Sequence, residues 1–393
     1  MPRQRVATPA TTAAELVNAY RPRDFLLSSA SGSLLGQGVL ATATGVEDLS
    51  EVLAGVATDT GRAAVAVGAL PFDRDAPAHL VVPETVRRGP AAASAAEAAP
   101  ARLPLSGTWT ATPVPDPAEH TVAVKRAVAL MTDPGDTALR KVVLARCLRL
   151  TGTGEADVAA VLANLLRADP TGFTFAADLP GRGTRPRTLV GASPELLVAK
   201  HGRSVVSHPL AGSAPRHPDP ARDREHAAAL FASAKERAEH AVVVEAVAEA
   251  LRPYCRRLDV PREPAPVTTA TMWHLATRVT GELRDPRTPS HLLARALHPT
   301  PAVCGHPTDR AYAAIAEIEP FDRGFYTGAV GHTDAAGDGE WVVTIRCADL
   351  CGGTVDLFAG GGIMPDSDPE AELAETTAKF RTLLRALGVD QTR

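Results

Sequence analysis

The sequence has few of the features that mark secreted or membrane-bound proteins. Its five cysteines are scattered and form no CxxC pair, in a chain of 393 residues that is too large to need disulfide cross-links. Residues 1–20 lack the apolar core of a signal peptide, and no later apolar run approaches the roughly 18 residues of a membrane span. We therefore expect reduced thiols in a cytoplasmic protein that does not associate with a membrane.

The sequence has no excess of positive charge. The formal net charge is −4, and no basic stretch is long enough to follow a phosphate backbone, so the sequence argues against a nucleic-acid-binding protein. Aromatic residues make up only 4% of the chain, but the hydrophobic fraction of 45% is enough for a substantial core. The composition therefore predicts a globular protein, and small anionic substrates remain possible.

The most informative stretch lies near the C-terminus, where three consecutive glycines, residues 360–362, precede a predicted helix. Glycine can adopt positive φ and lets an anionic ligand approach the backbone amides. Ser367 followed by Glu370 has the spacing of a capping box, and Pro369 is tolerated in a first helical turn. The pattern predicts a helix that begins next to a glycine-lined ligand site.

This helix is predicted to have two faces. At about 100° per residue, an apolar stripe ending in Phe380 and Leu384 lies opposite Glu372, Glu375 and Lys379. Two neighbouring carboxylates stabilise each other only if a cation sits between them. A charged face exposed to solvent is the simpler alternative.

Elsewhere the pattern alternates between helix and strand signals. Helices are predicted over residues 11–20, 46–57, 120–131 and 222–251, strands over 25–44, 63–72, 141–150 and 189–200, a turn-rich segment over 207–216 and an exposed low-complexity connection over 84–104. Lys141 falls on one strand face with small apolar residues, and Glu195 follows a tight turn. Glu236 and Glu239 repeat the i, i+3 carboxylate spacing, so two helices can offer four carboxylates to one hard divalent cation.

Nine segments, in the same order, resemble the chorismate-utilising enzymes. They are KVVLAR from Lys141, GASPELL around Glu195, PLAGS (209–213), KERAEH (235–240), WHLATRVTGEL (273–283), LHPTPAVCGHP (297–307), FDRGFYTGAVG (321–331), VVTIRCA (342–348) and AGGGI to SDPEAELAETTAK (359–379). Within this family, Lys141 and LHPTPAVCGHP are most similar to isochorismate synthases. The resemblance implies a Mg2+-dependent isomerisation of chorismate to isochorismate, by water addition at C2 and loss of the C4 hydroxyl, for siderophore, menaquinone or related metabolism.

The family also implies a fold. It is α+β, with a four-layer α/β/β/α arrangement around two large, mainly antiparallel sheets. We expect residues 1–393 to form one domain, with 1–104 as its N-terminal part and 118–389 as the chorismate-binding catalytic core.

Residue roles follow from the same resemblance. Lys141 is expected to be the general base and Glu195 the general acid, and Glu236, Glu239, Glu372 and Glu375 are expected to hold Mg2+. The expected substrate-binding residues are Gly212, Ser213, His274, Ala302, Val303, Tyr326, Arg346, Gly360, Gly362 and Lys379. We expect a monomer that needs no glutaminase subunit.

Three other functions stay open at this point. A salicylate synthase would go on to eliminate pyruvate from isochorismate. An anthranilate or aminodeoxychorismate synthase would use ammonia, although Lys141 in the base position favours water. A noncatalytic chorismate-binding protein would need neither Lys141 nor Glu195.

Overall fold

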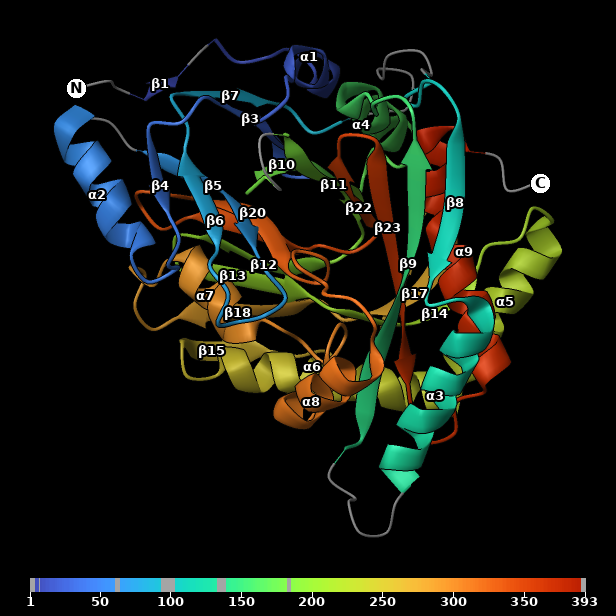
Figure 1. Ribbon diagram of the computed structural model, residues 1–393. Coiled ribbons are helices and arrows are strands. Elements are labelled where there is room, and N and C mark those ends of the chain that lie inside the picture. Colours follow the sequence, from blue (N-terminus) through green and yellow to red (C-terminus); the bar gives the residue numbers. More distant parts are fainter. Residues whose placement is uncertain are drawn as a thin grey trace.

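The computed structural model describes residues 4–6, 8–60, 64–92, 103–132, 139–181 and 185–389. Most of its strands belong to two large sheets (Figure 1). The eleven-stranded sheet contains, in spatial order, β1 (Arg5–Val6), β7 (Thr85–Gly89), β3 (Gly32–Gln37), β2 (Phe25–Ser29), β10 (Phe173–Leu179), β11 (Arg187–Ser193), β22 (Cys347–Cys351), β23 (Thr354–Ile363), β9 (Lys141–Gly152) and β19 (Gly305–His306), with β8 (Trp109–Val114) also paired to β9.

The second large sheet has nine strands, and a third sheet has three. The nine-stranded sheet contains β15 (Cys255–Asp259), β18 (Val279–Leu283), β13 (Ser204–His208), β12 (Leu196–His201), β21 (Gly339–Val343), β20 (Ala329–Asp334), β5 (Val65–Leu70), β6 (His79–Val82) and β4 (Ala41–Ala43). The small sheet contains β14 (Leu210–Pro215), β17 (Met272–Ala276) and β16 (Ala265–Thr268). Among the described strands, only the β1–β7 pair is parallel.

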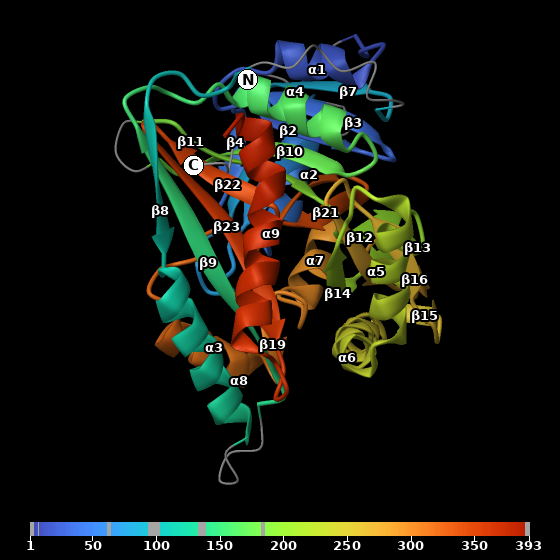
Figure 2. The same cartoon turned by 90° about the vertical axis from the view of Figure 1, so that its right-hand side faces the viewer.

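Helices cover the outer faces of the two large sheets. They are α1 (Ala13–Ala19), α2 (Leu49–Thr60), α3 (Pro117–Thr132), α4 (Val158–Ala168), α5 (Pro220–Ala232), α6 (Ala234–Leu251), α7 (Ser290–Leu297), α8 (Thr308–Ile318) and α9 (Pro369–Leu387). In Figure 2, α9 runs along β23 and β9, while α5 and α6 lie beside the small sheet.

The buried apolar clusters show the layers. One cluster packs α1, α4 and α9 on the eleven-stranded sheet, and another packs α2, α6 and α7 on the nine-stranded sheet. Between the sheets, Phe175 and Leu189 from the larger one meet Leu196, Val330 and Val342 from the other. The predicted four-layer α/β/β/α arrangement is confirmed.

Several local predictions were wrong. Residues 222–251 are not one helix, because Ser233 ends α5 and its side chain caps the N-terminus of α6 by accepting from the Glu236 amide. The segment 207–216 is not turn-rich, since β13 and β14 occupy most of it. The connection 84–104 begins with β7, which pairs inside the large sheet, and its residues 93–102 lie outside the described part.

The start of α9 also differs from the prediction. The N-cap is Asp368, whose side chain accepts from the Ala371 amide at 2.8 Å. Ser367 is buried and donates instead to Glu372 Oε1 at 2.7 Å. The Ser367–Glu370 capping box is therefore absent, and Ser367 belongs to the carboxylate site.

Candidate active site

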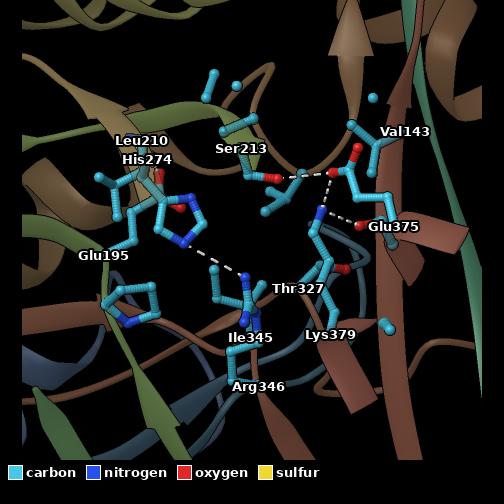
Figure 3. Close-up of a pocket in the computed structure, with 18 of the residues that line it drawn as sticks. Val143, Glu195, Leu210, Ser213, His274, Thr327, Ile345, Arg346, Glu375 and Lys379 are labelled. Carbon is cyan, nitrogen blue, oxygen red and sulfur yellow. Dashed lines mark hydrogen bonds and ion pairs between the residues drawn. The ribbon is translucent and has the colours of Figure 1, made fainter. Parts of the chain in front are cut away.

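A pocket lies where the two large sheets, the small sheet, α6 and α9 come together, and it encloses about 660 Å³ of empty space including its mouth. All ten predicted substrate-binding residues line it, together with Glu195, Glu239 and Glu375. Figure 3 shows several of these side chains pointing toward one cavity. Lys141, Glu236 and Glu372 do not line the pocket.

Two wall residues lie where the chain passes from one large sheet to the other. Glu195 falls between β11 and β12, and Arg346 falls between β21 and β22. The two crossing segments are hydrogen-bonded to each other, from Ala192 N to Arg346 O at 3.0 Å and from Val343 N to Glu195 O at 3.1 Å. Arg346 has φ of 50°, an uncommon backbone conformation for a residue other than glycine.

Glu195 is the most perturbed carboxyl group of the pocket. Its side chain is buried, with only a long contact of 3.5 Å from the Leu210 amide, and burial raises its pKa to about 8. The group is therefore protonated at neutral pH. A protonated carboxyl group facing a ligand cavity is suited to give up a proton, as a general acid must.

Lys141 is fully buried in β9, just behind the pocket wall. Its Nζ lies 2.8 Å from Glu239 Oε1 without an aligned hydrogen bond to any side chain of the described residues. Gly362, opposite Val143 in the β23–β9 pair, separates Lys141 from the cavity, and a Cβ there would lie 3.0 Å from Lys141 Cε. Lys141 therefore lies directly beside a residue of the pocket wall, and glycine at position 362 leaves room for its side chain.

Arg346 forms the cationic wall. Its guanidinium is buried, Nη1 has no partner in the described part of the chain, and Nη2 lies 3.4 Å from Nε2 of His274. Burial, followed by the charge of Arg346, holds the pKa of His274 well below its usual range, so the imidazole is neutral and Nε2 accepts. An unpaired, buried guanidinium N–H is a binding group for a carboxylate.

The opposite side of the pocket carries a second set of charges. Lys379 Nζ donates to Gly360 O at 2.7 Å and lies 2.6 Å from Glu375 Oε1, which also accepts from Ser213 Oγ at 2.9 Å (Figure 3). Burial opposes ionisation of Glu375, but Lys379 and Ser213 together hold its pKa below the usual range. Glu375 is therefore ionised and fixed in orientation.

The three glycines act differently from the prediction. Residues 360–362 belong to β23, and none of them has positive φ. A Cβ would lie 2.9 Å from the Tyr326 hydroxyl at Gly360, 2.9 Å from Glu372 Oε2 at Gly361 and 2.2 Å from Glu239 Oε1 at Gly362. Glycine at these positions leaves room for the side chains of Tyr326, Glu372 and Glu239, which lie against the strand.

The four predicted metal ligands are neighbours, but lysines separate them. Glu239 lies beside Lys141, Glu372 lies 3.3 Å from Lys235 Nζ, and Glu375 lies beside Lys379. Within the described residues, no three His, Cys, Asp or Glu side chains converge as a metal site. Burial, then Glu239 and Glu375, raise the pKa of Glu236 to about 7, which shows how closely the negative charges gather.

The sequence reasoning missed several wall residues. They are Pro194, Leu210, Ala211, Thr327, Ile345, Phe358 and Ala359. Phe358 stacks on Tyr326 with ring centroids 4.8 Å apart, and Thr327 is left-handed with φ of 59°. All of these residues except Phe358 lie inside the segments that carry the family resemblance, but the resemblance did not show that their side chains line the pocket.

No helix within the described residues is long and apolar enough to cross a membrane.

Comparisons with known proteins agree with this geometry. A family model described as "Chorismate binding enzyme" matches residues 61–388. Isochorismate synthase DhbC of Bacillus subtilis is 47% identical, with 97% of each chain covered. The crystal structure of DhbC from Bacillus anthracis superposes with a TM-score of 0.89 at 44% identity, covering 96% of this chain and 99% of that one.

A more distant structure shows the same fold. The menaquinone-specific isochorismate synthase MenF of Escherichia coli superposes with a TM-score of 0.81 at 24% identity, covering 96% of this chain and 92% of that one. The family match, the DhbC relatives and the pocket therefore agree on one assignment, and this chain is an enzyme that belongs to the chorismate-binding family.

Proposed function

We propose that the protein is an isochorismate synthase. It adds water to C2 of chorismate and releases the C4 hydroxyl, so that substrate and product are isomers. The observation that carries this proposal is the pairing of a buried, protonated acid, Glu195, with a buried amine, Lys141, around a pocket that has an unpaired guanidinium. The similarity to DhbC of Bacillus subtilis supports the same reaction.

Two proton transfers complete the reaction. Lys141 removes a proton from the water that attacks C2, and Glu195 donates its proton to the hydroxyl that leaves C4. The proton gained by one residue equals the proton lost by the other, so the enzyme returns to its starting state after exchange with solvent. Burial of both side chains limits the access of competing water to the acid and the base.

The substrate is a dianion, and the pocket offers separate sites for its two carboxylates. Arg346 is assigned to the enolpyruvyl carboxylate, because its Nη1 is unpaired and buried. Tyr326 lies against Gly360, so its hydroxyl and the backbone of β23 complete this site. The ring carboxylate is assigned to the side of the pocket that carries Glu239 and Glu375.

The residues on that side fit a magnesium ion. Glu372 Oε2 is a buried carboxylate oxygen with no hydrogen-bond partner among the described residues, and the strand beside it has glycine where a Cβ would collide with carboxylate oxygens. Hard oxygen ligands suit Mg2+. Glu239 and Glu375 would hold it directly, with Glu236 and Glu372 in support. The ion would supply positive charge for the ring carboxylate of chorismate.

We assign isochorismate, the product, as a precursor of 2,3-dihydroxybenzoate for a siderophore. This assignment is supported by the similarity to DhbC of Bacillus anthracis, which is described as specific for 2,3-dihydroxybenzoate. A glutaminase subunit has no role in the proposal, because water and not ammonia attacks the ring. The protein is proposed to act as a cytoplasmic monomer.

One experiment tests the reaction. Purified protein is incubated with chorismate and Mg2+, and the products are separated by chromatography, with Lys141→Ala as the inactive control. We expect isochorismate as the main product without pyruvate. Salicylate plus pyruvate as the main products would identify a salicylate synthase, and aminated products formed with added ammonia would identify the anthranilate type.

A further inference from the structure

A buried ion pair fills a gap in the large sheet beside the strand of Lys141. Along one edge of β9, β19 pairs with residues 141–142 and β8 pairs with residues 147–152, so no described strand pairs with this edge between them. The side chains of Arg323 and Glu319 occupy this position and are 2% and 3% exposed. They take the hydrogen bonds that a strand would otherwise make.

The hydrogen bonds of this pair are complete on the arginine side. An arginine side chain has five N–H donors, and every donor of Arg323 has an acceptor. Two donors go to Glu319. The other three go to Val143 O at 2.7 Å, Val303 O at 2.8 Å and Thr327 Oγ1 at 3.3 Å. Glu319 also accepts from the Ala145 amide at 2.7 Å.

The three acceptors outside the ion pair belong to separate walls of the pocket. Val143, Val303 and Thr327 all line it, and they come from β9, from the loop after α7 and from the turn before β20. Val143 lies two residues after Lys141 on the same face of β9. One guanidinium therefore sets the distances between three walls that are far apart in the sequence.

Thr327 has an unfavourable backbone conformation that its hydrogen bonds help to maintain. Its φ of 59° is rare for a β-branched residue, and such conformations persist only when the surroundings enforce them. Its amide donates to Thr344 O at 2.8 Å, and its hydroxyl accepts from Arg323. The guanidinium also lies over the Phe72 ring, 4.5 Å from the centroid, which fixes its plane.

We propose that Arg323, held by Glu319, is a positioning residue for catalysis that sets the place of the Lys141 strand relative to the 302–303 loop and Thr327. It does not line the pocket, so it acts through these three walls. The inference rests on the proposed function, because it needs Lys141 to take part in the reaction. Lysine cannot replace it, because an ammonium group lacks the planar fork that reaches acceptors in several directions.

The test compares Arg323→Lys with Lys200→Met. Lys200 is also buried and lies 2.6 Å from Asp338, but it does not line the pocket, so its loss reports on a buried ion pair alone. We expect Arg323→Lys to lower kcat about tenfold or more with KM changed less than about threefold, since small misplacements of catalytic groups cost rate more than binding. Lys200→Met is expected to lower Tm and leave kcat unchanged.

The dependence of kcat on pH distinguishes a positioning role of Arg323 from a general loss of stability. In Arg323→Lys, the apparent pKa of the alkaline limb of kcat should shift, because the amine of Lys141 and the carboxyl of Glu195 no longer keep their separation. Lys200→Met should keep the original profile. A folded Arg323→Lys protein with the kcat and pH profile of the unmodified enzyme would overturn the inference, as would an equal loss of kcat in Lys200→Met.

If Arg323→Lys does not fold, Thr327 provides the second test. Thr327→Ala loses the hydroxyl but keeps the cost of a left-handed backbone, whereas Thr327→Gly removes that cost. We expect the alanine variant to lose more kcat than the glycine variant. If both variants were as active as the unmodified enzyme, the positioning role of Arg323 would be contradicted. The product that the unmodified enzyme forms tests the proposed function. The ratio of the variant kcat to the unmodified kcat tests the positioning role of Arg323, whichever product is formed.

Discussion

Lys141 Nζ lies 2.8 Å from Oε1 of Glu239, so the residue assigned as base and a residue assigned to the metal share one ion pair. The pair joins β9 to α6, and both side chains are buried. A carboxylate oxygen that contacts the lysine nitrogen is less available to a divalent cation. In the proposed mechanism, proton transfer and metal binding are therefore coupled at this pair.

The first prediction follows from this coupling. Lys141→Met should bind Mg2+ more tightly, by about several-fold, because the side chain that competes with the ion for Glu239 Oε1 is removed. Calorimetric titration with Mg2+ measures the affinity without any need for turnover. Unchanged affinity in the variant would show that the ion does not use Glu239.

The second prediction concerns the carboxylates themselves. Glu239→Gln and Glu375→Gln should each abolish the Mg2+-induced rise in Tm and the activity, because each removes an anionic ligand. Glu249→Gln, on an exposed position of α6, is the matched control and should behave like the unmodified protein. Full activity of the unmodified protein in excess chelator would refute the metal requirement.

The third prediction assigns the acid and the base. Lys141→Ala and Glu195→Gln should each lower kcat by about 10²-fold or more with little change in substrate affinity, as expected when proton transfer is lost. Steady-state kinetics, with chorismate affinity measured separately by titration, gives both values. A variant whose only defect is a raised KM would remove its residue from the acid–base role.

The fourth prediction is a pH dependence. Burial raises the pKa of Glu195 to about 8, and the acid must be protonated to act, so kcat should fall as the pH rises through that value. Measuring kcat against pH tests this directly. In Glu195→Gln, the residual rate should lose this alkaline limb, and a limb that persists there would belong to another group.

The fifth prediction concerns the reaction's end point. Ala302 lines the pocket and has no hydroxyl to hydrogen-bond the enolpyruvyl chain, so isochorismate should leave before pyruvate is eliminated. Ala302→Thr should increase salicylate plus pyruvate as a share of product, where about 1.4 kcal/mol in one barrier changes the partition roughly tenfold. Chromatography of products from both proteins measures the share, and an unchanged share would mean that Ala302 only packs the turn.

Most of the candidate site residues were named from the segments that resemble the family. Glu195 and the ten substrate-binding positions came from short segments, and the structure brings them all to one pocket. Local pattern was less successful where burial has a functional cause. In α6, Ala234, Ala238 and Ala241 are exposed, whereas Glu239 and His240 are buried. A hydrophobic pattern cannot reveal that a helix turns its charges toward a site.

Other errors came from long-range pairing. Residues 360–362 were expected to use the positive φ that glycine allows, but ten residues of β9 pair with β23 through this segment and hold it as an extended strand. The helix break at Ser233 depends on a single cap that a continuous helical pattern hides. Arg323 was quoted only as part of a motif, because its role depends on acceptors 180 and 20 residues away in the chain.

The two crossing segments that carry Glu195 and Arg346 are bonded to each other as well as to both sheets. If one large sheet slides against the other, the acid and the guanidinium are displaced together, while Lys141 stays with β9. The distance between Glu195 and Arg346 therefore stays constant when the sheets move. The distance between Glu195 and Lys141, in contrast, depends on how the two sheets pack against each other. Substitutions that shrink Phe175 or Val330, which do not line the pocket, would then act on turnover more than on affinity.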